Sequence, residues 1–159
     1  MSLSKVMLDK TGRVLTPDDV RELIARFKNS YTDATKVIID QSKSLDQDGI
    51  TFIDCADRIL SNFGMTRAGP FHEKTENVLQ NCWNVVGSDL LAIRASVNQS
   101  GLSRERYLVE LGVPEREALF DQIWRITKKL LPFSMSGTSY GLVGASKILF
   151  SVLPEIVLP

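Results

Sequence analysis

The sequence predicts an all-α fold: a single-domain helical bundle of five to seven helices with a buried C-terminal apolar helix. Apolar residues recur at spacings of three and four along nearly the whole chain, which is the period of an amphipathic helix. Neither a strand pair with turn chemistry nor an internal repeat interrupts this pattern. With 159 residues, 43% of them hydrophobic, one core suffices, so we expect one domain over residues 1–159.

The first helix is expected from about Pro17 to about Ser42. Thr16 can accept a hydrogen bond from a first-turn amide, and Pro17 suits the first helical position. Asp18 and Asp19 then lie at the positive end of the helix dipole. The apolar residues that follow at helical spacing are Val20, Leu23, Ile24, Phe27, Tyr31, Ala34, Val37 and Ile38.

The second helix is expected to begin with Thr51 as its N-cap and to end at Gly64 in the left-handed conformation. The preceding segment, Asp46–Gly49, is similar to the start of a calcium-binding loop. With Gly49 at the glycine position of such a loop, Cys55 falls where the closing acidic ligand belongs. We therefore expect a plain turn there and no metal.

The third helix is expected from about His72 to about Ser100, and Gly101 closes it. Gly87, in its middle, lowers helix propensity and so indicates a closely packed neighbour. His72 and Glu73 are expected to be polar residues of the helix start, because no nucleophile motif accompanies them.

Two further helices follow. Ser103 is expected to cap a short helix that runs to Leu111 and ends at Gly112. Pro114 then opens a longer helix, which we expect Pro132 to stop because proline lacks the required amide.

The last helix is expected over Gly141–Leu153, where Lys147 is the only charge. Apolar residues fall on every side of its helical wheel, which is typical of a fully buried or a membrane-spanning helix. A helix of this length is only about 20 Å long, too short for a bilayer core of about 30 Å. We therefore expect the central helix of a soluble domain and no membrane partner, with Lys147 shielded by a partner or reaching the surface.

The tail after this helix ends in adjacent apolar residues, Ile156, Val157 and Leu158, between Pro154 and Pro159. We expect it to be docked in an extended form, because exposed apolar chain ends forgo burial energy. Its own core and a second copy of the chain are equally favoured, and a natural continuation of the chain is a third alternative.

Cofactors and metals are not expected. Cys55 and Cys82 lie in helical patterns beside apolar residues, as free buried thiols do. A single histidine, His72, leaves a zinc site short of ligands. The first nine residues lack the basic start and apolar run of a signal peptide, so a cytoplasmic location is expected.

The segment Tyr140–Lys147 resembles the helix-hairpin-helix element of DNA-binding and repair proteins, although its glycines, Gly141 and Gly144, are three apart rather than two. The resemblance implies that backbone amides of this turn contact a phosphate. The alternative, which we favour, is that the glycine pair permits close helix packing.

A basic cluster is a second feature that would suit phosphate or nucleic-acid binding. Arg125, Lys128 and Lys129 share one helix, and with Lys147 they could form an anion site beside the glycine-rich turn. A solvated helix face is the competing interpretation. The candidate anion-binding or nucleic-acid-binding residues are Arg125, Lys128, Lys129, Gly141, Gly144 and Lys147.

Two function classes remain. Nineteen basic and nineteen acidic residues give no net charge, which counts against a dedicated nucleic-acid binder. Wide apolar faces without a catalytic signature favour a non-catalytic protein-interaction or self-association module, with a protein partner or a homodimer. The alternative is a nucleic-acid-associated domain, and an active site assembled from scattered residues stays open.

Overall fold

The computed structural model describes residues 16, 18, 19, 22, 30–72, 74–134 and 141–157. The chain divides into two compact units, Met1–Ser30 and Tyr31–Pro159; one domain over residues 1–159 therefore stays a prediction. The all-α class is confirmed: the described residues form six α-helices and contain no strand. None of these helices combines the length and apolar character needed to cross a membrane.

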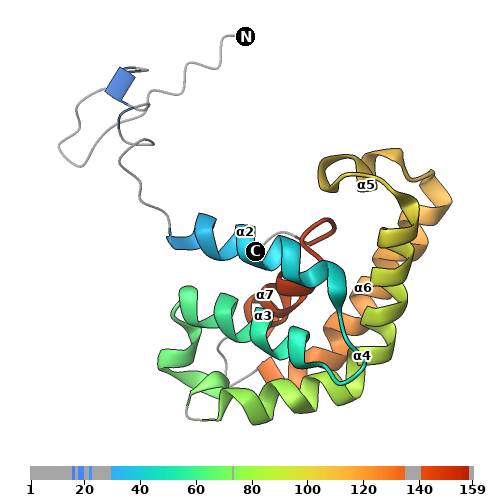
Figure 1. Ribbon diagram of the computed structural model, residues 1–159. Helices are drawn as coiled ribbons and strands as arrows, with labels where there is room; N and C mark the ends of the chain where they lie inside the picture. Colours follow the sequence, from blue (N-terminus) through green and yellow to red (C-terminus); the bar gives the residue numbers. More distant parts are fainter. Residues whose placement is uncertain are drawn as a thin grey trace, which may run out of the picture. The chain divides into compact units, whose positions relative to one another are not determined.

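Six α-helices and three short 3₁₀ turns follow one another in the described part of the chain (Figure 1). The α-helices are α2 (Ser30–Gln41), α3 (Ile50–Asn62), α4 (Thr75–Ser100), α5 (Arg104–Glu110), α6 (Val113–Ser134) and α7 (Gly141–Val152). The 3₁₀ turns are η1 (Ser42–Ser44), η2 (Met65–Arg67) and η3 (Gly69–Phe71). Helix α7 packs mainly against α3 and α6, and α4 packs against both α3 and α6.

Helix α7 is the buried C-terminal helix that the sequence predicts. Ile148, Leu149 and Phe150 are at most 1% exposed, so three successive directions around the helix are covered. Lys147 is 9% exposed, and its Nζ lies 3.5 Å from the centroid of the Phe63 ring. The expected shielding of this charge is thus confirmed as a cation–π contact. Burial lowers the pKa of Lys147.

The described residues of the first unit show the expected helix start. The Asp19 amide donates to Oγ1 of Thr16 over 3.2 Å, and the Thr16 amide donates to the Asp19 carboxylate over 2.8 Å. This reciprocal arrangement is a capping box. Residues 17, 20, 21 and 23–29 lie outside the described residues, so the continuous helix expected from about Pro17 to about Ser42 stays a prediction.

The N-cap of α3 differs from the prediction. The helix begins at Ile50, and Thr51 lies inside its first turn. Asp46 does the capping: its two carboxylate oxygens accept hydrogen bonds of 2.8 Å each from the amides of Ile50 and Thr51. The prediction was wrong because a carboxylate earlier in the turn reaches both free amides, which a threonine hydroxyl cannot do.

These hydrogen bonds set the acidity of Asp46. Desolvation alone would raise its pKa, but bonds from the Thr51 hydroxyl and amide and from the amides of Ile50 and Gly49 lower the pKa to about 2. Asp46 therefore acts as a helix cap in the plain turn that the sequence predicts, with Gly49 at a φ of 79°.

We expect Asp46→Ala to lower the free energy of unfolding by about 1 kcal/mol, because two first-turn amides lose their acceptor. The folded pKa lies below the ordinary 3.8, so the stabilisation is present above about pH 4 and is lost as the pH falls toward about 2. Urea denaturation at several pH values measures this difference. Asp48→Ala, in the same turn, is the control; equal effects of the two substitutions would contradict the assignment.

Trp83 connects this turn to α4. The residue is 7% exposed. Its ring lies 5.3 Å from the Phe52 ring between centroids and donates from Nε1 to the Gln47 carbonyl over 3.3 Å. A Cβ added at Gly87 would come within 2.8 Å of the indole, and one at Gly49 within 2.5 Å. The close neighbour expected at Gly87 is therefore Trp83 of the same helix.

Several helix ends are as expected and others differ. Gly64 follows α3 at a φ of 70°, and Gly101 follows α4. Helix α4 begins at Thr75 rather than near His72, because η3 occupies the preceding residues and the Thr75 hydroxyl donates to the Phe71 carbonyl.

Pro132 does not stop α6. The helix runs on to Ser134. A proline this close to the C-terminal end removes one helical hydrogen bond but leaves the last residues free to keep helical dihedrals. Ser134 then connects the helix end to α7, since its hydroxyl donates to the Gly141 carbonyl over 2.9 Å.

The two cysteines are free and buried, as predicted. Desolvation raises the pKa of Cys55 to about 11 and that of Cys82 to about 12. Both thiols therefore stay protonated at neutral pH and act as small apolar side chains.

The described part of the tail packs on the chain's own core. Ile156 and Val157 lie partly buried against it, and the backbone turns at Pro154 instead of continuing extended. Glu155 accepts two hydrogen bonds of 2.9 Å from the Arg94 guanidinium, which also donates to the Val152 carbonyl. The Arg94 and Glu155 side chains are only 3% and 7% exposed. Leu158 and Pro159 lie outside the described residues.

We expect Glu155→Ala to destabilise the fold by about 3–5 kcal/mol, because it leaves a buried guanidinium without its carboxylate. The double variant Arg94→Met/Glu155→Leu should recover most of this loss, since it removes both buried charges. Glu110→Ala removes the exposed pair with Arg106 and should cost no more than about 0.5 kcal/mol. Urea denaturation compares the three; similar losses for Glu155→Ala and Glu110→Ala would contradict the buried pair's role.

Candidate functional site

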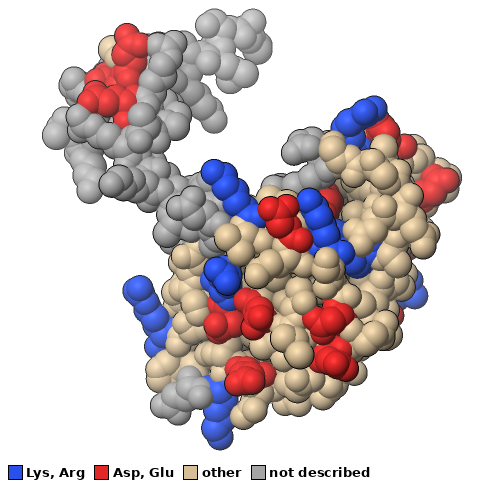
Figure 2. Space-filling model, viewed as in Figure 1, with Lys and Arg blue, Asp and Glu red and all other residues tan. Residues whose placement is uncertain are grey.

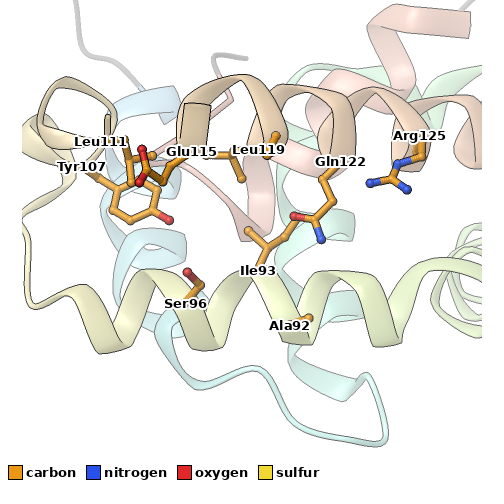
Figure 3. A pocket seen from close by; sticks show the side chains of 10 residues that line it. Ala92, Ile93, Ser96, Tyr107, Leu111, Glu115, Leu119, Gln122 and Arg125 are labelled. Atoms are coloured by element: carbon orange, nitrogen blue, oxygen red, sulfur yellow. The ribbon is translucent and has the colours of Figure 1, made fainter. Parts of the chain in front are cut away.

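A furrow of about 510 Å³ lies between α4 and α6 and is closed at one end by α5 (Figure 3). Figure 3 shows side chains of both helices directed into the space between them, with Tyr107 and Leu111 at the α5 end. The lining residues are Ala92, Ile93, Ser96, Tyr107, Leu111, Glu115, Ala118, Leu119, Gln122 and Arg125.

The furrow exists because small residues border a buried floor. Ile93, Tyr107 and Leu119 form the floor, and each is less than 9% exposed. Ala92 of α4 and Ala118 of α6 leave the space above them open, since neither side chain extends beyond its Cβ. Tyr107 fills the α5 end with a large ring.

The polar groups of the furrow are arranged by charge along its length. Glu115 lies at the α5 end and Arg125 at the opposite end, with Ser96 and Gln122 between them (Figure 3). Arg125 donates from Nε to the Asp121 carbonyl over 3.4 Å, which holds the guanidinium near the helix surface. A negative end, an apolar floor and a positive end therefore follow one another.

A second cavity, of about 270 Å³, extends the furrow along α6. Gln122 and Arg125 line both cavities, and Ile126 forms the floor of the second. At its end Nζ of Lys129 lies 2.8 Å from Oδ2 of Asp89, an ion pair between α6 and α4. From Glu115 to Lys129 the furrow follows α6 for about 21 Å, at 1.5 Å per residue.

The structure brings together only part of the candidate anion site. Arg125 and Lys129 both line the second cavity, although Lys129 is paired with Asp89. Lys128 is exposed on α6, and Lys147 is buried against Phe63.

Of the two glycines, Gly144 packs closely within the fold. Gly141 is engaged through its carbonyl, as acceptor from Ser134. A Cβ added at Gly144 would lie 2.9 Å from Cβ of Ser134 and 3.2 Å from the Phe71 ring. This geometry matches the favoured interpretation of close helix packing, while anion or nucleic-acid binding by the six residues stays a prediction.

Charge on the visible surface is mixed. Figure 2 shows Lys and Arg side chains interspersed with Asp and Glu over the described residues of that face, without a continuous basic area among them. Three acidic residues, Asp54, Asp57 and Glu76, line a separate cavity. Within the described ranges no three His, Cys, Asp or Glu side chains are placed to hold a metal ion.

Arg125 and Lys129 were predicted from the sequence as site residues, but the furrow around them was not. Glu115, Ala118, Gln122, Arg125 and Lys129 recur at spacings of three and four, and that signal is visible in the sequence. It indicates one face of a helix, but only the packing of α6 on α4 shows that this face borders an open furrow.

Comparisons of the chain with protein-family models, with curated proteins and with solved structures found no match.

Proposed function

We propose that this chain is a non-catalytic interaction domain that binds an amphipathic helix of a protein partner in the furrow between α4 and α6. The observation that carries the proposal is the furrow itself: it is about four helical turns long, Leu119 and Ile126 lie on its floor, and opposite charges lie toward its two ends. An amphipathic helix presents an apolar stripe of that length to a groove.

The small rim residues suit a helix as the occupant. Packed helices approach to about 8–10 Å between their axes, and small side chains permit the closer distances. Ala92, Ser96 and Ala118 border the furrow on its two sides. A third helix laid between α4 and α6 would therefore contact Ile93 and Leu119 without displacing a large side chain.

The charges favour one direction of the partner helix. Arg125 suits an acidic residue of the partner, and Glu115 suits a basic residue about two to three turns away. A helix inserted in the opposite direction would place like charges together at both ends. The partner's apolar positions at i, i+3 or i+4, and i+7 would face the floor.

A display library of helical peptides of about 16 residues, long enough for four turns, tests this proposal. We expect selection on the wild-type chain to enrich amphipathic sequences with an acidic residue near one end. Ala118→Trp fills the furrow and should weaken binding of the selected peptides by at least about tenfold. Arg125→Glu should change the preference at the matching peptide position from acidic to basic.

Phe120→Trp is the matched control, because it adds bulk to an exposed position of α6 that does not line the furrow. It should leave peptide affinity unchanged. The proposal fails if no helical peptide is enriched, or if Ala118→Trp binds the selected peptides as tightly as the wild-type chain does.

A further inference from the structure

Helix α6 carries a second apolar surface, which the furrow does not use. Val113, Phe120 and Trp124 are 58%, 48% and 51% exposed. Leu131 continues the series and is partly exposed. At about 100° per residue these four side chains fall within roughly 40° of one another around the helix. We call them the α6 stripe.

The α6 stripe faces away from the furrow. By the same helical period, Phe120 and Trp124 each lie about 160° around the axis from Gln122, which lines both cavities of the furrow. Something bound to the stripe therefore leaves the furrow open. Two large aromatic side chains left half exposed one turn apart are unusual on a surface without a partner.

The residues of the α6 stripe are spaced symmetrically about position 122 of the helix. Val113 and Leu131 are equally far from position 122, and so are Phe120 and Trp124. Consider a second α6 helix packed antiparallel on the first, with the two-fold axis at the level of residue 122. This arrangement places Phe120 of each copy against Trp124 of the other. It also places Val113 of each copy against Leu131 of the other. Such self-complementarity is what a two-fold symmetric interface requires.

The charges beside the stripe agree with this direction. Glu117 and Lys128 are both exposed and lie about 20° apart around α6, on one side of the stripe. The antiparallel arrangement places Glu117 of each copy next to Lys128 of the other, which gives two equivalent ion pairs. A parallel two-fold arrangement would instead place the two copies of Glu117, and the two copies of Lys128, on opposite sides of the interface, so neither ion pair would form.

We propose that two copies of this chain form a symmetric dimer through antiparallel α6 helices, with the α6 stripe at its centre. Phe120 and Trp124 supply the apolar contact, and Glu117 and Lys128 select the direction. This inference is independent of the proposed function, because the stripe and the furrow lie on opposite sides of α6.

Sedimentation equilibrium of the full chain at loading concentrations up to about 100 μM, which detects micromolar dissociation constants, tests the dimer. We expect dimers for the wild-type chain. Trp124→Lys should raise the dissociation constant at least about 100-fold, since buried tryptophans dominate such interfaces. Val109→Lys, at an apolar position that is 76% exposed on α5, should leave the dimer unchanged.

A charge exchange tests the direction of the helices. Glu117→Lys alone and Lys128→Glu alone should each weaken the dimer by about tenfold, and the double variant should restore it. Each altered position is exposed, and unchanged circular dichroism shows that the variants still fold. The proposal is overturned by a wild-type chain that stays monomeric, by a dimer that survives Trp124→Lys, or by a double variant that is weaker than either single one.

Discussion

The requirement to bury α7 on almost every side determines how the other described helices are arranged. A helix with apolar residues all around its axis needs cover in every direction, and α3 and α6 supply most of that cover. The contact leaves little spare space: a single added Cβ at Gly144 would press on Ser134 and Phe71. The only charge of the helix is accommodated against Phe63 instead of being excluded.

Helix α4 connects segments that are far apart in the chain. Its Trp83 bonds to the turn before α3, Arg94 holds the tail, and Asp89 pairs with Lys129 of α6. The first two contacts are buried and the third is at the surface, so they differ in how much they contribute to the stability of the fold. Burial makes the Arg94 pair costly to break, whereas the exposed Lys129 pair chiefly marks the end of the furrow.

Helical periodicity was enough to predict the all-α class and the central place of α7, because both depend on local spacing and apolar character. Local rules were less accurate where two residues could cap the same helix. Thr51 was predicted as the N-cap of α3, but the Asp46 carboxylate provides the cap. The furrow could not be predicted. The spacing of Ala118 and Arg125 in the sequence shows only that both lie on one face of a helix. Which neighbour that face meets depends on contacts between distant segments.

The position of α7 along the chain affects how the protein can fold during its synthesis. Helix α3 ends at Asn62, and α7, which covers it, begins only at Gly141. At about 5–20 residues per second, ribosomal elongation between these points takes about 4–16 s. Throughout that time the apolar face of α3 lacks the helix that buries it, and the face of α6 lacks it from the synthesis of Ser134 until α7 follows. Chaperone binding to the nascent chain would therefore be most useful after α3 has emerged and before α7 has.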